Sequence, residues 1–441
     1  MVNHNYDYFI MYYMYIKQFI GLFKTIFYYS ISFFDYRKPV IWNKEDIVFF
    51  CSYGNIPGEI PWDFTSLNKG CGGSEHSILN LSKELSKKYK ITIFNNVPKE
   101  IKFNNIVFKP CKNFNFNDKF NVLISWRLPW LFSLGKLVNS SNNILWLHDA
   151  TPLSTQKILR DYFGNFIENL VYRFTFFSNN INSIVVPSKF MEKLFNDTKK
   201  KFNFNTNIVR IPNGIMDYYD LLSNNNDFIG NINYVKIHKN KSLKIIKKNK
   251  SFKNLISIQN NELLKRNINR IIWTVNPDRG IEILLKNWQE LLKINKKIEL
   301  QVYSNFKIYK NTDKYNIVKL LKQKNIYVND LIGHDELIKK YNESSLFIYP
   351  CKINEAFSIC SWEALKNGCI TIISNNIATA LSELKEYGAD IVNNEYLLLE
   401  KIKYYISNKN NIVNKRYELK NNKKYILNWN KVSKKWENIL N

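Results

Sequence analysis

The sequence predicts an α/β protein with two doubly wound, Rossmann-like domains that face each other across a cleft. The chain has 441 residues, which is too long for one ordinary domain and suits two of roughly 150 to 200 residues. Short β-branched runs, apolar on both faces, alternate with helical segments, as in the βαβ units of a parallel sheet. A polar interval rich in Asn and Lys, residues 224–253, separates two such series.

The chain begins with an apolar and aromatic segment, residues 8–34, within a predicted N-terminal unit 1–45. It is long enough to span a bilayer as a hydrophobic helix. Lys17 and Lys24 lie seven residues apart and would share one helical face. This pattern favours a helix lying in the membrane interface over one that crosses it. A transmembrane anchor and an extension packed on the body remain alternatives, whereas the lysines argue against a signal peptide.

The first Rossmann-like domain is predicted over residues 46–215. Its opening strand is followed by a glycine-rich loop and a helix from about Ser74 to Lys88. Short apolar runs of this kind are typical of strands buried on both faces of a sheet. The predicted strands are 46–53, 91–95, 122–126, 143–149, 183–188 and 208–214.

A polar insert or linker is predicted over 216–268, followed by a second Rossmann-like domain over 269–410. A helix is expected from about Gly280, after the first strand of this domain. The tail, 411–441, has a helical pattern with Trp429 and Trp436 and is expected to pack on the body. The predicted strands of the second domain are 270–275, 298–304, 326–332, 345–350 and 369–374.

Lys and Arg outnumber Asp and Glu by 64 to 37, giving a net charge of +27. Such an excess attracts polyanions, but the bases are scattered and accompany abundant Asn, Ile, Tyr and Phe, as an AT-rich coding bias produces. A nucleic-acid partner is therefore not expected. The six cysteines form no CxxC pair, which favours a reduced, intracellular setting. No His/Cys group has zinc-ligand spacing and no Asp-x-Asp triplet occurs, so no metal site is predicted.

Polar residues follow several predicted strands of the first domain, at the edge where ligands bind in such sheets. Gly72 and Gly73 precede a helix and suit a phosphate at its N-terminus, although a plain capping turn is equally consistent. His148 could bond a substrate hydroxyl, pass a proton, or be a structural histidine. Asp149 follows it, and Arg127 lies past another strand, where it contacts a ligand or forms a surface salt bridge.

In the second domain, Arg279 lies at a turn between a strand and a helix, where its guanidinium can grip a diphosphate. Glu355 follows the strand 345–350, and Glu363 lies eight residues later within a predicted helix. The short segment 356–358 leads into that helix, whose free N–H groups can face a phosphate. Ionised carboxylates accept hydrogen bonds from sugar and ribose hydroxyls, which gives both glutamates a purpose in a basic chain.

The segment EAFSICSWE, from Glu355 to Glu363, resembles the Glu-x7-Glu motif of retaining family 4 glycosyltransferases with the GT-B fold. The segments GGSE (72–75), VVPSKF (185–190), RIPNGIMD (210–217) and PDRG (277–280) match further landmarks of that family, and the resemblance covers about 46–392. Two positions depart from the pattern. Ser358 replaces a usual glycine, which leaves phosphate contact intact if its φ stays negative. Thr274 stands where many members have a second basic residue, so that phosphate binding depends more on Arg279.

The resemblance implies a hexosyltransferase-like enzyme that moves a sugar, with retention, from a nucleotide-diphosphate donor to a hydroxyl of a glycan, lipid or protein-linked sugar. Glu355 and His148 would be the catalytic residues, with Glu355 holding the transferred sugar. Arg127 and Asp149 would contact the acceptor. No metal or other cofactor is required if Arg279 and helix N-termini neutralise the leaving group. The expected location is the cytoplasmic side, peripheral to a membrane. Donor contacts would come from Arg279, Ala356, Phe357, Ser358, Glu363, Gly72 and Gly73.

Three other functions remain open at this point. The same fold serves sugar-nucleotide epimerases, and a glucosyltransferase acting on DNA would give the positive charge a direct role. Against the latter, the bases form no concentrated stripe with interleaved aromatics. A catalytically silent protein that binds sugar nucleotides is the third alternative, and the glutamate pair with Arg279 and His148 disfavours it.

Overall fold

The computed structural model describes residues 37–51, 61–132, 138–149, 180–218, 266–304, 314–351, 353–375, 379–422, 424 and 426–440. The predicted helix 8–34 and most of the predicted insert 216–268 lie outside these ranges. Among the described helices, none is both long and apolar enough to cross a membrane.

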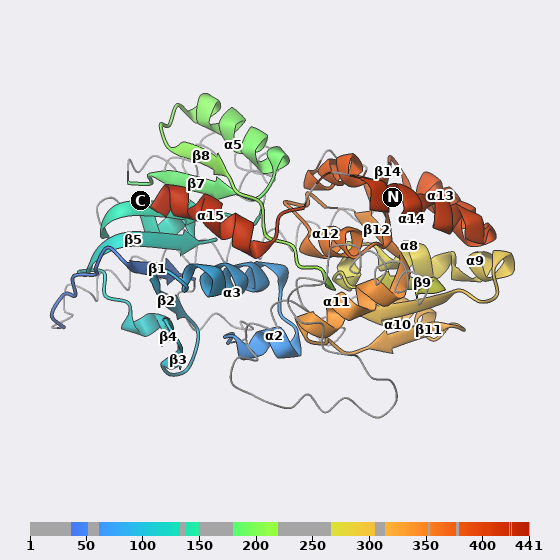
Figure 1. Ribbon diagram of the computed structural model, residues 1–441, viewed down its shortest axis with the longest axis horizontal. Coiled ribbons are helices and arrows are strands. Elements are labelled where there is room, and N and C mark those ends of the chain that lie inside the picture. The colour runs from blue at the N-terminus through green and yellow to red at the C-terminus, as the bar shows by residue number, and fades with distance from the viewer. Residues whose placement is uncertain are drawn as a thin grey trace, which may run out of the picture.

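The described residues form two sheets side by side along the long axis of the molecule (Figure 1). The first has the order β3-β4-β2-β1-β5-β6-β7-β8 and is parallel except for the β3–β4 pair. Parallel pairing directs the carboxyl ends of the strands to one edge. The strands are β1 (Asp46–Phe50), β2 (Lys90–Asn95), β3 (Ile101–Phe103), β4 (Ile106–Pro110), β5 (Lys119–Trp126), β6 (Asn139–Trp146), β7 (Ser183–Val186) and β8 (Asn207–Arg210).

The second sheet has the order β11-β10-β9-β12-β13-β14 and is parallel throughout its described pairs. Its central strand β12 is buried at all eight positions. The two parallel-sheet domains confirm the predicted fold class. The strands are β9 (Asn267–Trp273), β10 (Glu299–Tyr303), β11 (Ile326–Asn329), β12 (Ser344–Cys351), β13 (Ile370–Asn375) and β14 (Asp390–Val392).

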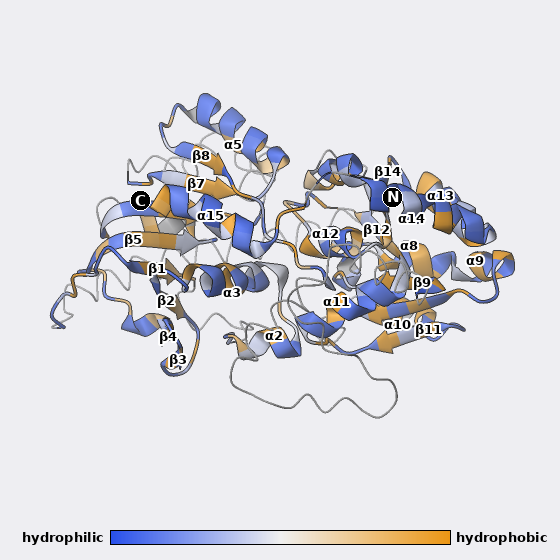
Figure 2. Ribbon diagram, viewed as in Figure 1, coloured by the Kyte–Doolittle hydropathy of each residue, from blue (hydrophilic) through white to orange (hydrophobic). Residues whose placement is uncertain are grey.

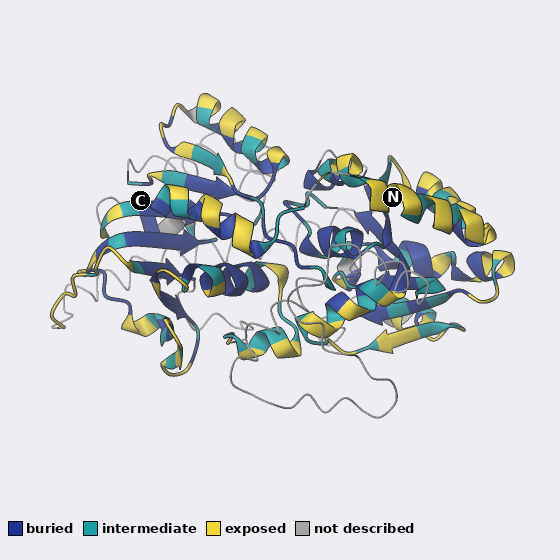
Figure 3. Cartoon of the chain, viewed as in Figure 1, coloured by how far each residue is buried: buried dark blue, intermediate teal, exposed yellow. Residues whose placement is uncertain are grey.

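Helices cover both sheets, and their outer faces are polar and exposed while the strands between them are apolar and buried (Figures 2 and 3). Burying β-branched and aromatic side chains on both sheet faces is the main stabilising contribution. The helices are α2 (Thr65–Lys69), α3 (Gly73–Leu85), α5 (Lys189–Phe202), α8 (Ile281–Lys286), α9 (Trp288–Ile294), α10 (Lys314–Leu320), α11 (His334–Glu343), α12 (Ile359–Lys366), α13 (Glu395–Ser407), α14 (Lys409–Asn421) and α15 (Trp429–Leu440), with 3-10 turns η1 (Cys111–Asn113), η2 (Pro129–Phe132), η5 (Pro277–Arg279) and η7 (Ala380–Tyr387).

The C-terminal tail forms two helices rather than the single one its pattern suggested, because the chain leaves α14 and returns to the first domain. There α15 packs beside α3 and the first sheet (Figure 1). Trp436 is buried with its ring 4.9 Å from that of Trp146. The amide of Asn142 donates to the carbonyl of Ile439 at 2.8 Å. The last helix of the chain therefore completes the core of the first domain.

Replacing Trp436 by Ala is expected to lower the free energy of unfolding by about 3–5 kcal/mol, because it removes a large buried ring and leaves a cavity. Urea unfolding followed by circular dichroism measures the change. Tyr417→Ala is the matched control, since this aromatic on α14 is 70% exposed, and its replacement should cost no more than about 0.5 kcal/mol. Equal losses in the two variants would contradict the assigned role of α15.

Candidate active site

The candidate active site lies where the carboxyl ends of both sheets meet. From the first domain, Arg127 follows β5, while His148 and Asp149 follow β6, which ends at Trp146 rather than at the predicted 149. From the second domain, Arg279 ends the turn η5 after β9, and Glu355 follows β12. Residues far apart in the sequence thus reach one edge because the strands that carry them are parallel neighbours.

Arg127 and Asp149 form an ion pair in the first domain. The Nε of Arg127 lies 2.7 Å from Oδ2 of Asp149, and its Nη1 lies 3.9 Å from Oε1 of Glu75. Burial alone would raise the pKa of Asp149, but the charge and hydrogen bond of Arg127 lower it, with His148 and Arg279 adding to the effect. The influence of Arg279 shows that the second domain contributes its charge to this pair.

Glu355 is held by residues of its own domain. The hydroxyl of Tyr349 donates to Oε2 of Glu355 at 2.6 Å, and Nη1 of Arg279 lies 4.0 Å from the same oxygen. The next residue, Ala356, is 4% exposed and packs in the core cluster of the first domain. The loop that carries Glu355 is therefore anchored on both sides of the domain junction.

The glycine turn also lies at this junction. A Cβ added to Gly73 would meet the side chain of Ile359, at the start of α12, at 3.6 Å. One at Gly72 would lie 2.3 Å from Oε2 of Glu75. The Glu75 carboxylate thus occupies the position above this helix N-terminus that the sequence assigned to a phosphate, an arrangement that the helix dipole favours. Glu75 was missed as a site residue, although it lies only two residues after the glycine pair.

Backbone strain is concentrated here. Among the described residues, five non-glycine residues have positive φ, and three of them are asparagines, which tolerate this conformation. The other two are Arg127, with φ 61°, and Ser358, with φ 59°. The condition of negative φ at Ser358, on which phosphate contact was expected to depend, is therefore not met, because this residue caps α12 in a left-handed conformation. Such strain is typical of functional sites.

His148 is neutral at physiological pH. Burial and, to a smaller extent, the charge of Arg127 lower its pKa to about 3, against an opposing effect of Asp149. Its ring lies 4.6 Å from that of Trp146, and its buried Nε2 has no hydrogen-bond partner within the described part of the chain. A neutral imidazole in this position can bond a hydroxyl, but it is a poor proton carrier near pH 7.

Glu363 lies apart from the Glu355 loop, deeper in the protein. It is 1% exposed, and its Oε1 lies 2.7 Å from Nε2 of His334. Burial alone would lower the pKa of His334, but the charge and hydrogen bond of Glu363 raise it. His76 completes this group, and burial together with the charge of His334 lowers its pKa well below the usual value. The histidines are too far apart in the sequence for spacing to reveal the cluster.

Solved structures share this architecture. WaaG, a glycosyltransferase involved in lipopolysaccharide biosynthesis, matches with a TM-score of 0.54 at 12% identity, over 89% of this chain and 99% of its own. Anabaena Alr3699/HepE, solved with UDP and glucose, matches with 0.54 at 12% identity, over 90% and 99%. An α,α-trehalose-phosphate synthase (UDP-forming) from Burkholderia vietnamiensis matches with 0.53 at 9%, over 90% and 96%. No protein-family model and no curated sequence match the chain. The predicted GT-B fold is confirmed.

The free energy of unfolding is expected to decrease as the pH is lowered, because of His148. In the unfolded chain this histidine takes up a proton near pH 6.5, whereas in the folded protein it stays neutral down to about pH 3. Between these values the unfolded state binds more protons, so acid favours unfolding, by up to about 1.4 kcal/mol per pH unit.

His148→Gln cannot titrate, so the wild-type protein should lose about 1–2 kcal/mol more than the variant between pH 6.5 and pH 5. Urea unfolding at the two pH values measures both losses. Parallel pH profiles for the two proteins would show that His148 takes up its proton at the same pH in the folded and unfolded states, and would contradict the lowered pKa.

Proposed function

We propose that the protein is a glycosyltransferase that moves a sugar from a nucleotide-diphosphate donor to a hydroxyl acceptor with retention of configuration. The observation that carries the proposal is the meeting of Arg279 and Glu355 with the Arg127–Asp149 pair where the two domains join. The fold supports it, since WaaG is a glycosyltransferase and the Burkholderia protein is a UDP-forming trehalose-phosphate synthase.

The second domain supplies the donor contacts. Arg279 offers a charged, forked set of N–H donors to the diphosphate and stabilises the charge that develops as it leaves. Glu355, oriented by Tyr349 at 2.6 Å, accepts hydrogen bonds from the hydroxyls of the transferred sugar. The segment 356–358 places the N-terminus of α12 beside the phosphates, with Gly73 against its first turn. Glu363, whose Oε1 pairs with His334, accepts from the ribose hydroxyls through its other carboxylate oxygen.

The first domain supplies the acceptor contacts. The pKa of Asp149 is lowered, so its carboxylate is ionised near neutral pH and can accept a hydrogen bond from the attacking hydroxyl. The unpartnered Nε2 of His148 can bond a hydroxyl of either substrate. Arg127 holds Asp149 in place through its 2.7 Å contact. These roles orient the reacting groups, which is a large part of catalysis in group transfer.

The charge balance of this site supports transfer without a metal on the diphosphate, because Arg279 and the N-terminus of α12 supply the compensating charge. Residues 8–34 support a location at the cytoplasmic face of a membrane, where an interfacial helix would hold the enzyme near a lipid-linked or membrane-bound acceptor. Nucleic acid is not proposed as a partner.

Replacing Glu355 by Gln is expected to lower kcat/KM at least about 100-fold, because a neutral amide accepts weaker hydrogen bonds from the sugar and lacks the charge that an oxocarbenium-like transition state favours. Radiolabelled nucleotide sugars with different bases and sugars are incubated with the protein, and transfer, hydrolysis and epimerisation are scored separately. Nuclear magnetic resonance of the product gives its anomeric configuration.

Glu400→Gln is the matched control, because this exposed carboxylate pairs only with Lys403 on α13 among the described contacts, at 2.9 Å. Its activity should equal that of the wild type. Unchanged turnover in Glu355→Gln would refute the site, and an inverted product would refute retention. A nucleotide sugar epimerised without an acceptor would favour the epimerase alternative, while nucleotide binding without turnover of any donor would favour the silent one.

A further inference from the structure

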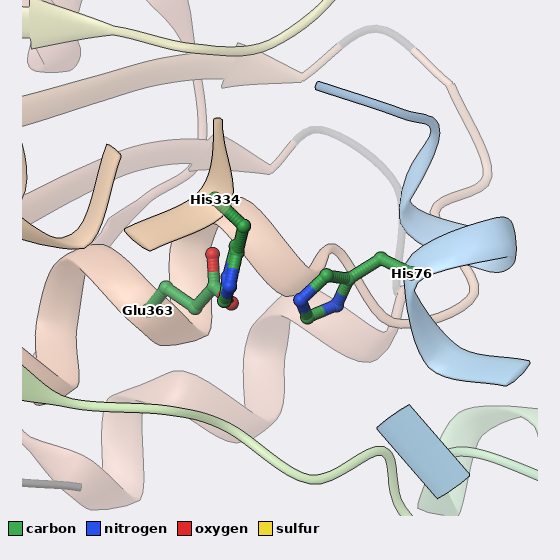
Figure 4. A group of neighbouring side chains, drawn as sticks. All are labelled: His76, His334 and Glu363. Atoms are coloured by element: carbon green, nitrogen blue, oxygen red, sulfur yellow. Dashed lines mark hydrogen bonds and ion pairs between the residues drawn. The ribbon is translucent and has the colours of Figure 1, made fainter. Parts of the chain in front are cut away.

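Three side chains from three helices meet beneath the candidate active site. They are His76 on α3, His334 at the start of α11 and Glu363 on α12 (Figure 4). The rings of His76 and His334 lie 3.8 Å apart between centroids, at an interplanar angle of 51°. One ligand atom from each residue lies within 4.8 Å of the others. The three groups therefore converge on one point.

Among the residues that the structure describes, the side chain of His76 has no hydrogen-bond partner. Its side chain is 4% exposed, and both ring nitrogens are buried without a hydrogen bond. Buried polar groups are nearly always paired, and an unpaired one costs about 1–3 kcal/mol. Ring stacking on His334 satisfies neither nitrogen. A bound ligand that accepts the lone pair of His76 would remove this cost.

We propose that His76, His334 and Glu363 bind a divalent transition-metal ion, with Zn²⁺ as the best match. Two imidazoles and one carboxylate are a ligand set that zinc prefers, and hard ions such as Mg²⁺ and Ca²⁺ prefer oxygen ligands alone. Binding replaces the hydrogen bond between His334 and Glu363 with two bonds to the ion and releases the shared proton to solvent. A water molecule takes the fourth position.

The ion would join the two domains. His76 belongs to the first domain, whereas His334 and Glu363 belong to the second. A metal bond between them fixes the spacing of α3 and α12, and with it the position of Gly73 against Ile359 in the candidate active site. Glu363 has two carboxylate oxygens, so it can bind the ion through one and a ribose hydroxyl through the other. The role of the ion is separate from neutralising the diphosphate.

The test uses the full-length protein, treated with a chelator and dialysed into metal-free buffer. Titration calorimetry with ZnCl₂ should show one site per chain with a Kd of about 1 µM or tighter, and Zn²⁺ should raise the melting temperature. Co²⁺ in place of Zn²⁺ should give the visible absorption of a four-coordinate site. An absence of stoichiometric Zn²⁺ binding by the wild-type protein would overturn the proposal.

His76→Phe keeps a ring of similar shape and removes the ligand, so its Zn²⁺ affinity should fall at least about tenfold, equivalent to 1.4 kcal/mol. Where that variant fails to fold by circular dichroism, Glu363→Gln, which preserves the side-chain size, takes its place. His148→Gln is the control, since it removes a buried histidine outside the cluster and should leave the affinity unchanged. A folded cluster variant that binds Zn²⁺ as tightly as the wild type would place the ion elsewhere and overturn the proposal.

Discussion

Parallel strand pairing within both sheets decides where this protein can carry chemistry. Because neighbouring strands run the same way, the residues after β5, β6, β9 and β12 all emerge at carboxyl edges, and the two edges meet at the domain junction. The strands themselves are buried on both faces and leave little room for polar side chains. At the domain junction the charged side chains Arg127, Asp149, Arg279 and Glu355 come from the loops after the strands, and they lie close enough to compensate one another.

Placing these charged groups at the junction requires strained backbone conformations, which contacts in the rest of the fold stabilise. Arg127 has positive φ, and its backbone N–H is fixed to the carbonyl of Trp146 at 2.9 Å, so the strained turn is tied to the neighbouring strand. Ser358 is likewise held, through its hydroxyl, 2.9 Å from that of Ser361. Strain of about 1–3 kcal/mol per residue persists only where surrounding contacts determine the conformation. The turns at Arg127 and Ser358 are therefore held in their conformation before any ligand binds, which suits a reaction governed by orientation and charge.

The sequence predicted the features that follow from the burial of strands. It did not predict the features that depend on how helices pack or on local backbone conformation. Glu355, Arg279 and His148 were found because each lies at or shortly after the end of a short apolar run. The edge strands β3 and β14 were missed because three partly exposed residues each give no such run. Strand β4 was also missed, because its buried positions alternate with partly exposed ones. The cluster of His76, His334 and Glu363 depends on how three helices pack, and residue spacing carries no information about that. The positive φ of Ser358 follows from the path of the chain into α12, not from its own preference.

Two glycines connect the domain junction to the histidine cluster. A Cβ on Gly70 would lie 2.8 Å from the carbonyl oxygen of Ile332, and one on Gly333 would lie 2.7 Å from that of Asn68. Only residues without a side chain allow the loops before α3 and α11 to approach this closely. Gly333 immediately precedes His334, so the same contact sets the distance between His334 and His76. Any larger residue at either position would push these loops apart and would separate the two imidazoles, so the cluster depends on how closely the two domains pack.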